Sequence, residues 1–262
     1  MLKKFKFYHK IMQDVCCCFE QGKRKRTAGC KVADAETENN GKMERRTMKK
    51  GIIFDMDGTL WDSAEGIAES WSQVIAEEYA PDCVITVEDI HRVMGKTMDD
   101  IAQILFPELT KEKRSGLLAS CCEAENAYLR AHGGVLYQGL EDTWKKLKES
   151  YPLYIVSNCQ SGYIEAFLDY YGLWEFIEDR ECFGNTGVDK GENIRKVVER
   201  SHLTDAVYVG DIQGDYDASR KAGVRFIHAA YGFGTIHTAV PAIHSLQELP
   251  KAVEEIFGSA RE

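Results

Sequence analysis

Short, largely apolar runs alternate with stretches of helical period along most of this chain. The runs have the length of buried parallel strands and lie at 51–54, 153–156, 206–209 and 224–228, and a further strand edge is predicted at 181–184. Apolar positions recur every three or four residues in 139–149, 164–171, 191–201, 215–222 and 250–257, which predicts helices. The alternation predicts an α/β fold, a doubly wound parallel sheet with helices on both faces.

A block of helical pattern interrupts this alternation. Ile67, Trp71 and Tyr79 share one helical face, and Pro81 ends that run. Three more helices are predicted at 87–94, 98–105 and 111–130. We therefore predict a helical cap subdomain, residues 67–135, inserted into a Rossmann-like core of residues 48–66 and 136–262.

The first 50 residues differ in charge from the rest of the chain. They hold 14 Lys and Arg against 6 Asp and Glu, a net charge of +8, whereas the remainder carries −17 and the whole chain −9. Such a segment could bind nucleic acid or an anionic membrane, but its composition favours a solvated, disordered basic extension over residues 1–47. Met48 precedes the first strand, and we hypothesise that it is the natural start.

Composition narrows the class of protein. Hydrophobic residues make up 44% and charged residues 29%, as in ordinary globular proteins, and no apolar stretch approaches the roughly 18 residues of a membrane span. The nine cysteines form no paired metal-binding pattern. We expect a cytoplasmic monomer or homodimer with reduced thiols and with neither nucleic acid nor membrane as a partner.

Two carboxylates follow the first strand directly. Asp55 and Asp57 stand two residues apart on an extended backbone, so both side chains can reach one site. By itself the pair is equally consistent with a polar turn after the strand. Other strand ends carry Ser157-Asn158 and Asp211 with Asp215, and Lys190 precedes a helix. In a doubly wound sheet these carboxyl ends lie at one edge, which predicts a common site.

These residue types suit phosphoryl transfer. A carboxylate such as Asp55 can attack phosphorus and form an aspartyl phosphate, and Asp57 can act as general acid and then base. Asp55, Asp211 and Asp215 together suit Mg²⁺, which prefers oxygen ligands. Positive charge and hydrogen-bond donors for the phosphate come from side chains and backbone N–H groups, namely Lys190, Ser157, Gly58 and Thr59.

The same motifs resemble those of the haloacid dehalogenase superfamily, in the phosphoglycolate-phosphatase-like group with a helical cap. The segment 54–63 matches its first motif, Ser157-Asn158 the second, Lys190 the third and 210–215 the fourth, within a resemblance that covers about 48–257. One departure is Gly191, where a proline usually follows the lysine.

The resemblance implies a role for each of these residues. Asp55 would be the nucleophile and Asp57 the acid/base. Mg²⁺ would be held by Asp55, the backbone carbonyl of Asp57 and Asp211, with Asp215 in support. The phosphate would bind Ser157, Lys190, and the backbone of Asn158.

The expected activity is Mg²⁺-dependent hydrolysis of a small phosphorylated metabolite, with 2-phosphoglycolate as the first candidate. A phosphosugar mutase would use Asp55 identically, and a non-catalytic phosphate-binding regulatory module is a third alternative. The cap would determine the choice of substrate. Lys96 lies in a loop that resembles the substrate-facing cap loop of relatives. It is either a contact for a substrate carboxylate or second phosphate, or a solvated surface lysine.

Overall fold

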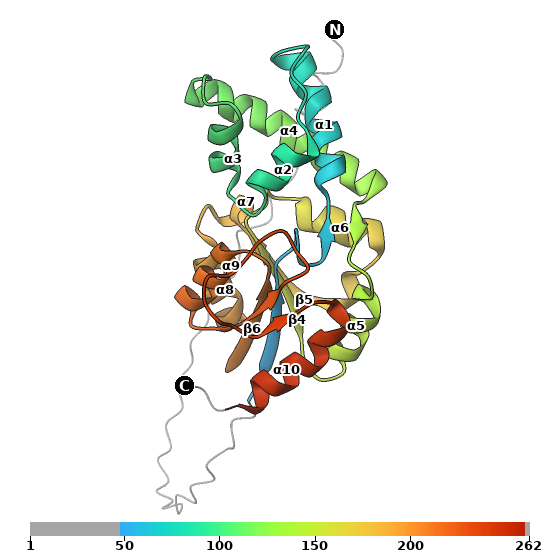
Figure 1. The fold of residues 1–262 in the computed structure, drawn as a ribbon, viewed down its shortest axis with the longest axis vertical. Helices are drawn as coiled ribbons and strands as arrows, with labels where there is room; N and C mark the ends of the chain where they lie inside the picture. Colours follow the sequence, from blue (N-terminus) through green and yellow to red (C-terminus); the bar gives the residue numbers. More distant parts are fainter. Residues whose placement is uncertain (1–47, 260–262) are drawn as a thin grey trace, which may run out of the picture. The chain divides into compact units, whose positions relative to one another are not determined.

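The computed structural model describes residues 48–259 (Figure 1). The predicted disordered extension, residues 1–47, lies outside this range. A parallel sheet of six strands forms the centre of the fold, in the order β5-β4-β1-β6-β7-β8. Its strands in chain order are β1 (Lys50–Phe54), β4 (Leu153–Ser157), β5 (Ile177–Cys182), β6 (Asp205–Gly210), β7 (Arg225–Ala229) and β8 (Ala242–Ile243).

Successive strand residues point to opposite faces of the sheet, and both faces are apolar. Helices therefore cover both faces. Ile52 and Phe54 belong to one apolar cluster, and Ile53 belongs to the other. The helices α5 (Leu140–Lys148), α6 (Tyr163–Tyr171) and α10 (Leu249–Gly258) pack in the first cluster, and α8 (Lys190–Arg200) and α9 (Gln213–Ala222) in the second. The prediction of a doubly wound α/β fold is confirmed.

The helical insertion lies between two very short strands. β2 (Trp61–Asp62) and β3 (Val135–Leu136) pair antiparallel and bring the two ends of the insertion together. Between them run α1 (Ala64–Glu78), α2 (Val87–Val93), α3 (Met98–Leu105) and α4 (Lys111–His132). Sequence periodicity did not reveal β2 and β3, since two residues are too few to show alternation. The exact limits of the cap as a domain, residues 67–135, stay a prediction.

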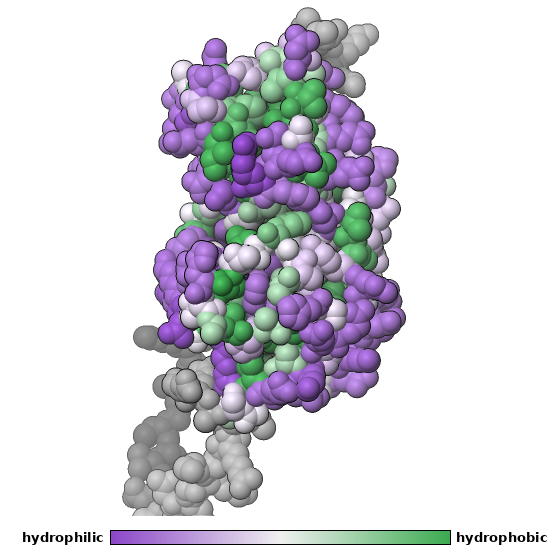
Figure 2. All heavy atoms as spheres, viewed as in Figure 1, coloured by the Kyte–Doolittle hydropathy of each residue, from purple (hydrophilic) through white to green (hydrophobic). Residues whose placement is uncertain are grey.

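Threonines begin three of the four inserted helices. The hydroxyls of Thr86, Thr97 and Thr110 each accept a backbone N–H from the first turn of α2, α3 and α4, which satisfies a donor that the helix leaves free. The helices bury apolar sides against one another, with α1 against α4 as the most extensive pair. Figure 2 shows hydrophobic residues over this insertion and in the middle of the lower part of the same face, with hydrophilic residues around both. No described helix is both long and apolar enough to cross a bilayer.

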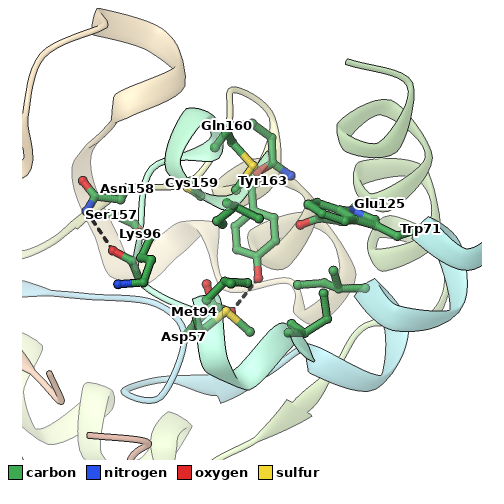
Figure 3. Close-up of a pocket in the computed structure, with 16 residues that line it drawn as sticks. Asp57, Trp71, Met94, Lys96, Glu125, Ser157, Asn158, Cys159, Gln160 and Tyr163 are labelled. Atoms are coloured by element: carbon green, nitrogen blue, oxygen red, sulfur yellow. Dashed lines mark hydrogen bonds between the residues drawn. The ribbon is translucent and has the colours of Figure 1, made fainter. Parts of the chain in front are cut away.

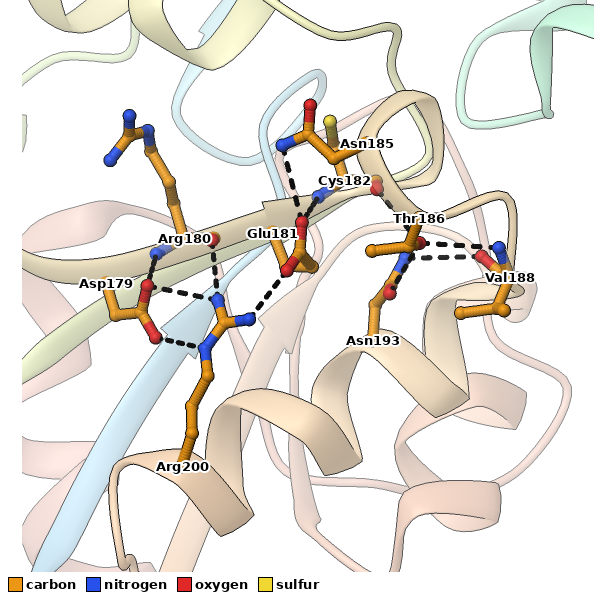
Figure 4. A network of polar contacts seen from close by, with 9 residues as sticks. All are labelled: Asp179, Arg180, Glu181, Cys182, Asn185, Thr186, Val188, Asn193 and Arg200. Atoms are coloured by element: carbon orange, nitrogen blue, oxygen red, sulfur yellow. Dashed lines mark hydrogen bonds and ion pairs between the residues drawn. The ribbon is translucent and has the colours of Figure 1, made fainter. Parts of the chain in front are cut away.

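Charged residues protect the exposed edge strand β5. Arg200 of α8 bonds Asp179 at 2.5 Å through Nε and Glu181 at 2.6 Å through Nη1 (Figure 4). Charges on an edge strand discourage pairing with another chain. They also hid the strand in the sequence, where only 181–184 was predicted. Instead, β5 covers Ile177–Cys182 and is followed by the short helix α7 (Phe183–Thr186). Two short 3₁₀ segments complete the fold, η1 (Trp174–Phe176) and η2 (Leu246–Glu248).

Candidate active site

The predicted site residues gather at the carboxyl edge of three neighbouring strands. β1 lies between β4 and β6, where the strand order reverses, and this is where ligands bind in open α/β sheets. Asp55 follows β1, Ser157 ends β4 and Asp211 follows β6. Asp215 reaches the same place from the first turn of α9.

One lysine bridges two of the buried carboxylates. The Nζ of Lys190 lies 2.9 Å from Asp55 Oδ1 and 2.6 Å from Asp215 Oδ1, and all three side chains are at least 96% buried. Lys190 is the first residue of α8, whose N-cap is Asp189, rather than part of a preceding loop. The two carboxylates raise the pKa of Lys190 against the opposing effect of burial, so its charge is retained.

A third carboxylate completes a set with the geometry of a metal site. Asp55, Asp211 and Asp215 each place one oxygen within 4.8 Å of the others. A side chain at Gly58 or at Gly232 would overlap the Asp211 carboxylate, so both glycines leave room for it. Gly58 also adopts a φ of +80°, which favours glycine.

The charge balance of this set also fits a cation. Burial and mutual repulsion raise the pKa of Asp55 to about 7 and that of Asp211 to about 8, although Lys190 opposes both shifts. One ammonium therefore does not neutralise the group. Several buried oxygen ligands with an excess of negative charge match the chemistry that Mg²⁺ prefers. The residues present fit the predicted metal.

Asp57 is held by two hydroxyl groups on one of its oxygens. Tyr163 of α6 donates to Oδ1 at 2.5 Å, and Ser63 donates to the same atom at 2.8 Å. Burial raises the pKa of Asp57 to about 6, and these two hydrogen bonds limit the rise. A carboxyl with a pKa near neutrality can both release and accept a proton.

The remaining predicted phosphate ligands are partly engaged elsewhere. The N–H of Gly58 donates to Trp61 O at 3.0 Å and that of Thr59 to Met56 O at 3.2 Å, so both groups are used within their own loop. Their role at a phosphate stays a prediction and requires these bonds to be shared. Within the described residues, the Thr59 hydroxyl is a buried group without a partner. Asn158 donates its side-chain amide to Gly95 O of the cap at 2.9 Å, which leaves its backbone for the predicted contact.

The loop after β7 supports the site from the other side. The N–H of Phe233 donates to Asp211 Oδ2 at 2.8 Å, and the hydroxyl of Tyr231 donates to Thr59 O at 2.8 Å. His228 Nε2 lies 3.1 Å from the carbonyl oxygen of Asp211. These contacts fix the orientation of Asp211 and the position of the loop after β1.

A cavity of about 30 Å³ lies between the core site and the cap. The core contributes Asp57, Ser157 and Asn158, and the cap contributes Lys96. Figure 3 shows Tyr163 pointing toward Asp57, with Lys96 on one side and Trp71 beside Glu125 on the other. Lys96 lines this cavity and is at the same time exposed to solvent, and its contact with a substrate stays a prediction.

Sequence reasoning missed several residues of this site. Tyr163 and Gln160 follow the second motif by a few positions, and nothing in their spacing connects them with Asp57. Glu125 lies on α4 in an otherwise amphipathic helix. The sequence could indicate its burial only through helical spacing, because Glu125 lies four residues from both Cys121 and Leu129 on the buried side of α4.

Taken together, the parallel α/β fold and the buried carboxylates with Lys190 at its switch point have the arrangement of an enzyme site. The family model of haloacid dehalogenase-like hydrolases matches residues 52–229, and the chain belongs to this family. A phosphoglycolate phosphatase of Rhodobacter capsulatus is 26% identical over 220 residues, which are 79% of this chain and 98% of the relative. The predicted phosphoglycolate-phosphatase-like family and phosphatase class are confirmed.

Solved structures share the fold. A predicted phosphoglycolate phosphatase from Haemophilus somnus superposes with a TM-score of 0.67 at 18% identity and covers 79% of this chain and 99% of its own. CbbY from Rhodobacter sphaeroides, in complex with phosphate, has a TM-score of 0.65 at 19% identity, with coverage of 77% and 96%. At these identities the likeness supports the fold alone.

Proposed function

We propose that the protein is a Mg²⁺-dependent phosphomonoesterase that works through an aspartyl phosphate on Asp55. The observation that carries the proposal is the contact of Lys190 with Asp55 and Asp215 beside a third buried carboxylate, Asp211. An anion-binding ammonium next to a buried carboxylate is the arrangement that nucleophilic attack on a phosphate requires.

The chain's residues can account for both halves of the reaction. A carboxylate oxygen of Asp55 forms the bond to phosphorus as the ester bond breaks, and Asp57 gives its proton to the departing alkoxide. A water molecule then attacks the same phosphorus, Asp57 takes up the proton, and the Asp55–phosphorus bond breaks to release phosphate. Tyr163 and Ser63 both engage Oδ1, which leaves Oδ2 of Asp57 for these transfers.

Phosphate binding and metal binding use the remaining groups. Lys190 and the Ser157 hydroxyl would hold the phosphate oxygens, with the backbone at Gly58, Thr59 and Asn158 as further donors. Asp55, the Asp57 carbonyl, Asp211 and Asp215 would hold Mg²⁺. The ion supplies charge neutralisation between the nucleophile and the phosphate.

We expect a small phosphomonoester as the substrate, in keeping with the small cavity under the cap, and a cytoplasmic location for the protein. The named relatives make 2-phosphoglycolate a candidate. A phosphosugar mutase remains the competing activity on the same scaffold, since it would use Asp55 in the same way.

Phosphate release tests the proposal. We expect the protein to hydrolyse 4-nitrophenyl phosphate with Mg²⁺ and to lose this activity on chelation or in Asp55→Asn. Asp217→Asn, an exposed aspartate of α9, is the matched control and should retain activity. Metal-independent turnover, or turnover by Asp55→Asn, would contradict the mechanism. Glucose 1-phosphate followed for isomerisation without phosphate release distinguishes a mutase.

A further inference from the structure

A buried carboxylate of the cap faces the cavity without serving the proposed chemistry. Glu125 of α4 is 2% exposed, and its Oε2 accepts the indole N–H of Trp71 at 2.7 Å. Among residues 48–259, the charged group that influences it is Asp57, which has the same sign. Trp71 and Gln160 hydrogen-bond this carboxylate, but among the described residues no ion pair neutralises it, and buried charges of this kind concentrate at functional sites.

Two further acceptors line the same cavity without a donor. Gln160 Oε1 and Asn158 Oδ1 are buried and have no hydrogen-bond partner in the described part of the chain. Gln160 as a whole is 8% exposed. A buried acceptor left without a donor costs free energy, so this wall of the cavity is suited to a ligand that brings donors.

The orientation of both amides follows from their neighbours. Asn126 donates to the backbone carbonyl of Ser161 at 2.8 Å, which turns its own oxygen toward Gln160 Nε2 at 3.1 Å. Asn158 donates to the backbone carbonyl of Gly95. Because a carbonyl oxygen can only accept, neither amide can be reversed without losing a bond. The free atoms at the cavity are therefore acceptors.

The cation of the cavity, Lys96, lies beside Asn158 and away from Glu125 (Figure 3). Lys96 lies on the opposite side of Tyr163 from Glu125 (Figure 3). A substrate carboxylate could reach Lys96, but it would share the cavity with Glu125 and Asp57. A hydroxyl group can donate to Glu125, to Gln160 or to Asn158, and it carries no charge that Lys96 or Glu125 would repel.

We propose that Glu125, with Gln160 and Asn158, selects substrates whose leaving group carries a further hydroxyl group and disfavours substrates whose leaving group carries a carboxylate. This inference rests on the proposed phosphatase function and narrows its substrate class to small hydroxylated phosphomonoesters. It therefore ranks 2-phosphoglycolate below a hydroxylated ester of equal length.

Four two-carbon phosphates separate these possibilities. The kcat/KM of the wild-type protein with Mg²⁺ is compared for 2-hydroxyethyl phosphate, 2-aminoethyl phosphate, ethyl phosphate and 2-phosphoglycolate. We expect the hydroxyethyl ester to exceed 2-phosphoglycolate and ethyl phosphate by about tenfold or more, as a hydrogen bond to a charged group allows. A preference for 2-phosphoglycolate would overturn the inference in favour of Lys96, and a preference for the aminoethyl ester would replace hydroxyl selection by charge selection.

Glu125→Gln tests the residue itself because it removes the charge at constant size. We expect the hydroxyethyl-to-phosphoglycolate ratio of kcat/KM to fall about tenfold. A structural role alone would lower both rates and leave the ratio unchanged, which overturns the proposal. Glu123→Gln, on the exposed side of α4, should keep the wild-type ratio. If wild type hydrolyses neither these esters nor 4-nitrophenyl phosphate, the proposed function itself fails, and this result is distinct from an altered ranking.

Discussion

Tyr163 donates a 2.5 Å hydrogen bond to Oδ1 of Asp57 from a helix that lies 106 residues further along the chain. The same hydroxyl lies 2.7 Å from the Ser63 hydroxyl, which bonds the same carboxylate oxygen. The three groups form a buried cluster beneath the cavity. In it the proposed acid/base is fixed from two directions, by the segment after β1 and by α6.

Loss of the Tyr163 hydroxyl should weaken catalysis without breaking the fold. In Tyr163→Phe we expect kcat for an alkyl phosphate to fall about tenfold, the effect of one hydrogen bond to a charged group. The bond lowers the pKa of Asp57, so its removal raises that pKa above about 6. Asp57 then stays protonated to higher pH, so the alkaline limb of the plot of kcat against pH shifts to higher pH.

The control for this variant is Tyr170→Phe. Tyr170 lies on the same helix and is 44% exposed. It should keep the wild-type rate and pH profile. An unchanged profile in Tyr163→Phe would remove Tyr163 from the positioning of Asp57.

Much of the fold and half of the site could be predicted because their signals are local. The segment 51–63 contains a complete strand, the two aspartates and the following turn within 13 residues. Lys190 and Asp211 could be added because each begins or precedes a regular element. The contact between Lys190 and Asp55 could not be predicted in this way, because it depends on the order of the strands in space.

The remaining features depend on packing between distant segments. Gln160 and Glu125 come together only because α4 packs against α6 and the loop that precedes it. The strands β2 and β3 are defined by each other, since neither is long enough to show a period. The strand β5 was obscured by charges such as Asp179 and Glu181, which serve the neighbouring Arg200.

Lys190 should be as important for stability as for activity. In Lys190→Met the carboxylates of Asp55 and Asp215 lose their ammonium partner while they stay buried, and we expect a loss of about 3–5 kcal/mol in the free energy of unfolding. Urea unfolding in the presence of EDTA measures this loss. Lys196→Met, an exposed lysine of the same helix, should change stability by no more than about 0.5 kcal/mol. Equal stability of the two variants would contradict the assigned ion pairs.

The acidic site should make the metal-free protein less stable as pH rises. The pKa is raised to about 7 in Asp55, about 6 in Asp57 and about 8 in Asp211, from an ordinary value of 3.8. At pH values between the ordinary pKa and these raised pKa values, the folded state binds more protons than the unfolded chain. The free energy of unfolding therefore decreases with increasing pH. In EDTA we expect the melting temperature to fall from pH 5 to pH 8.

Added Mg²⁺ should reverse this trend. At pH 8 the ion replaces the missing protons and raises the melting temperature, whereas at pH 5 protons compete with it and the rise is smaller. Asp211→Asn should flatten the pH dependence in EDTA, and Asp217→Asn should leave it as in wild type. A melting temperature in EDTA that rises across this range would contradict the raised pKa values.

Two glycine-to-alanine changes should alter the free energy of unfolding in opposite directions. Gly58 has a φ of +80° and a Cβ there would overlap the Asp211 carboxylate, so Gly58→Ala should destabilise the fold by at least about 1 kcal/mol and abolish Mg²⁺-dependent hydrolysis. Gly116 lies inside α4 with open space around its Cβ position, and Gly116→Ala should stabilise by up to about 1 kcal/mol through helix propensity. Urea unfolding and phosphate release measure both variants. If Gly58→Ala is as stable and active as Gly116→Ala, the loop after β1 does not hold Asp211 in the proposed way.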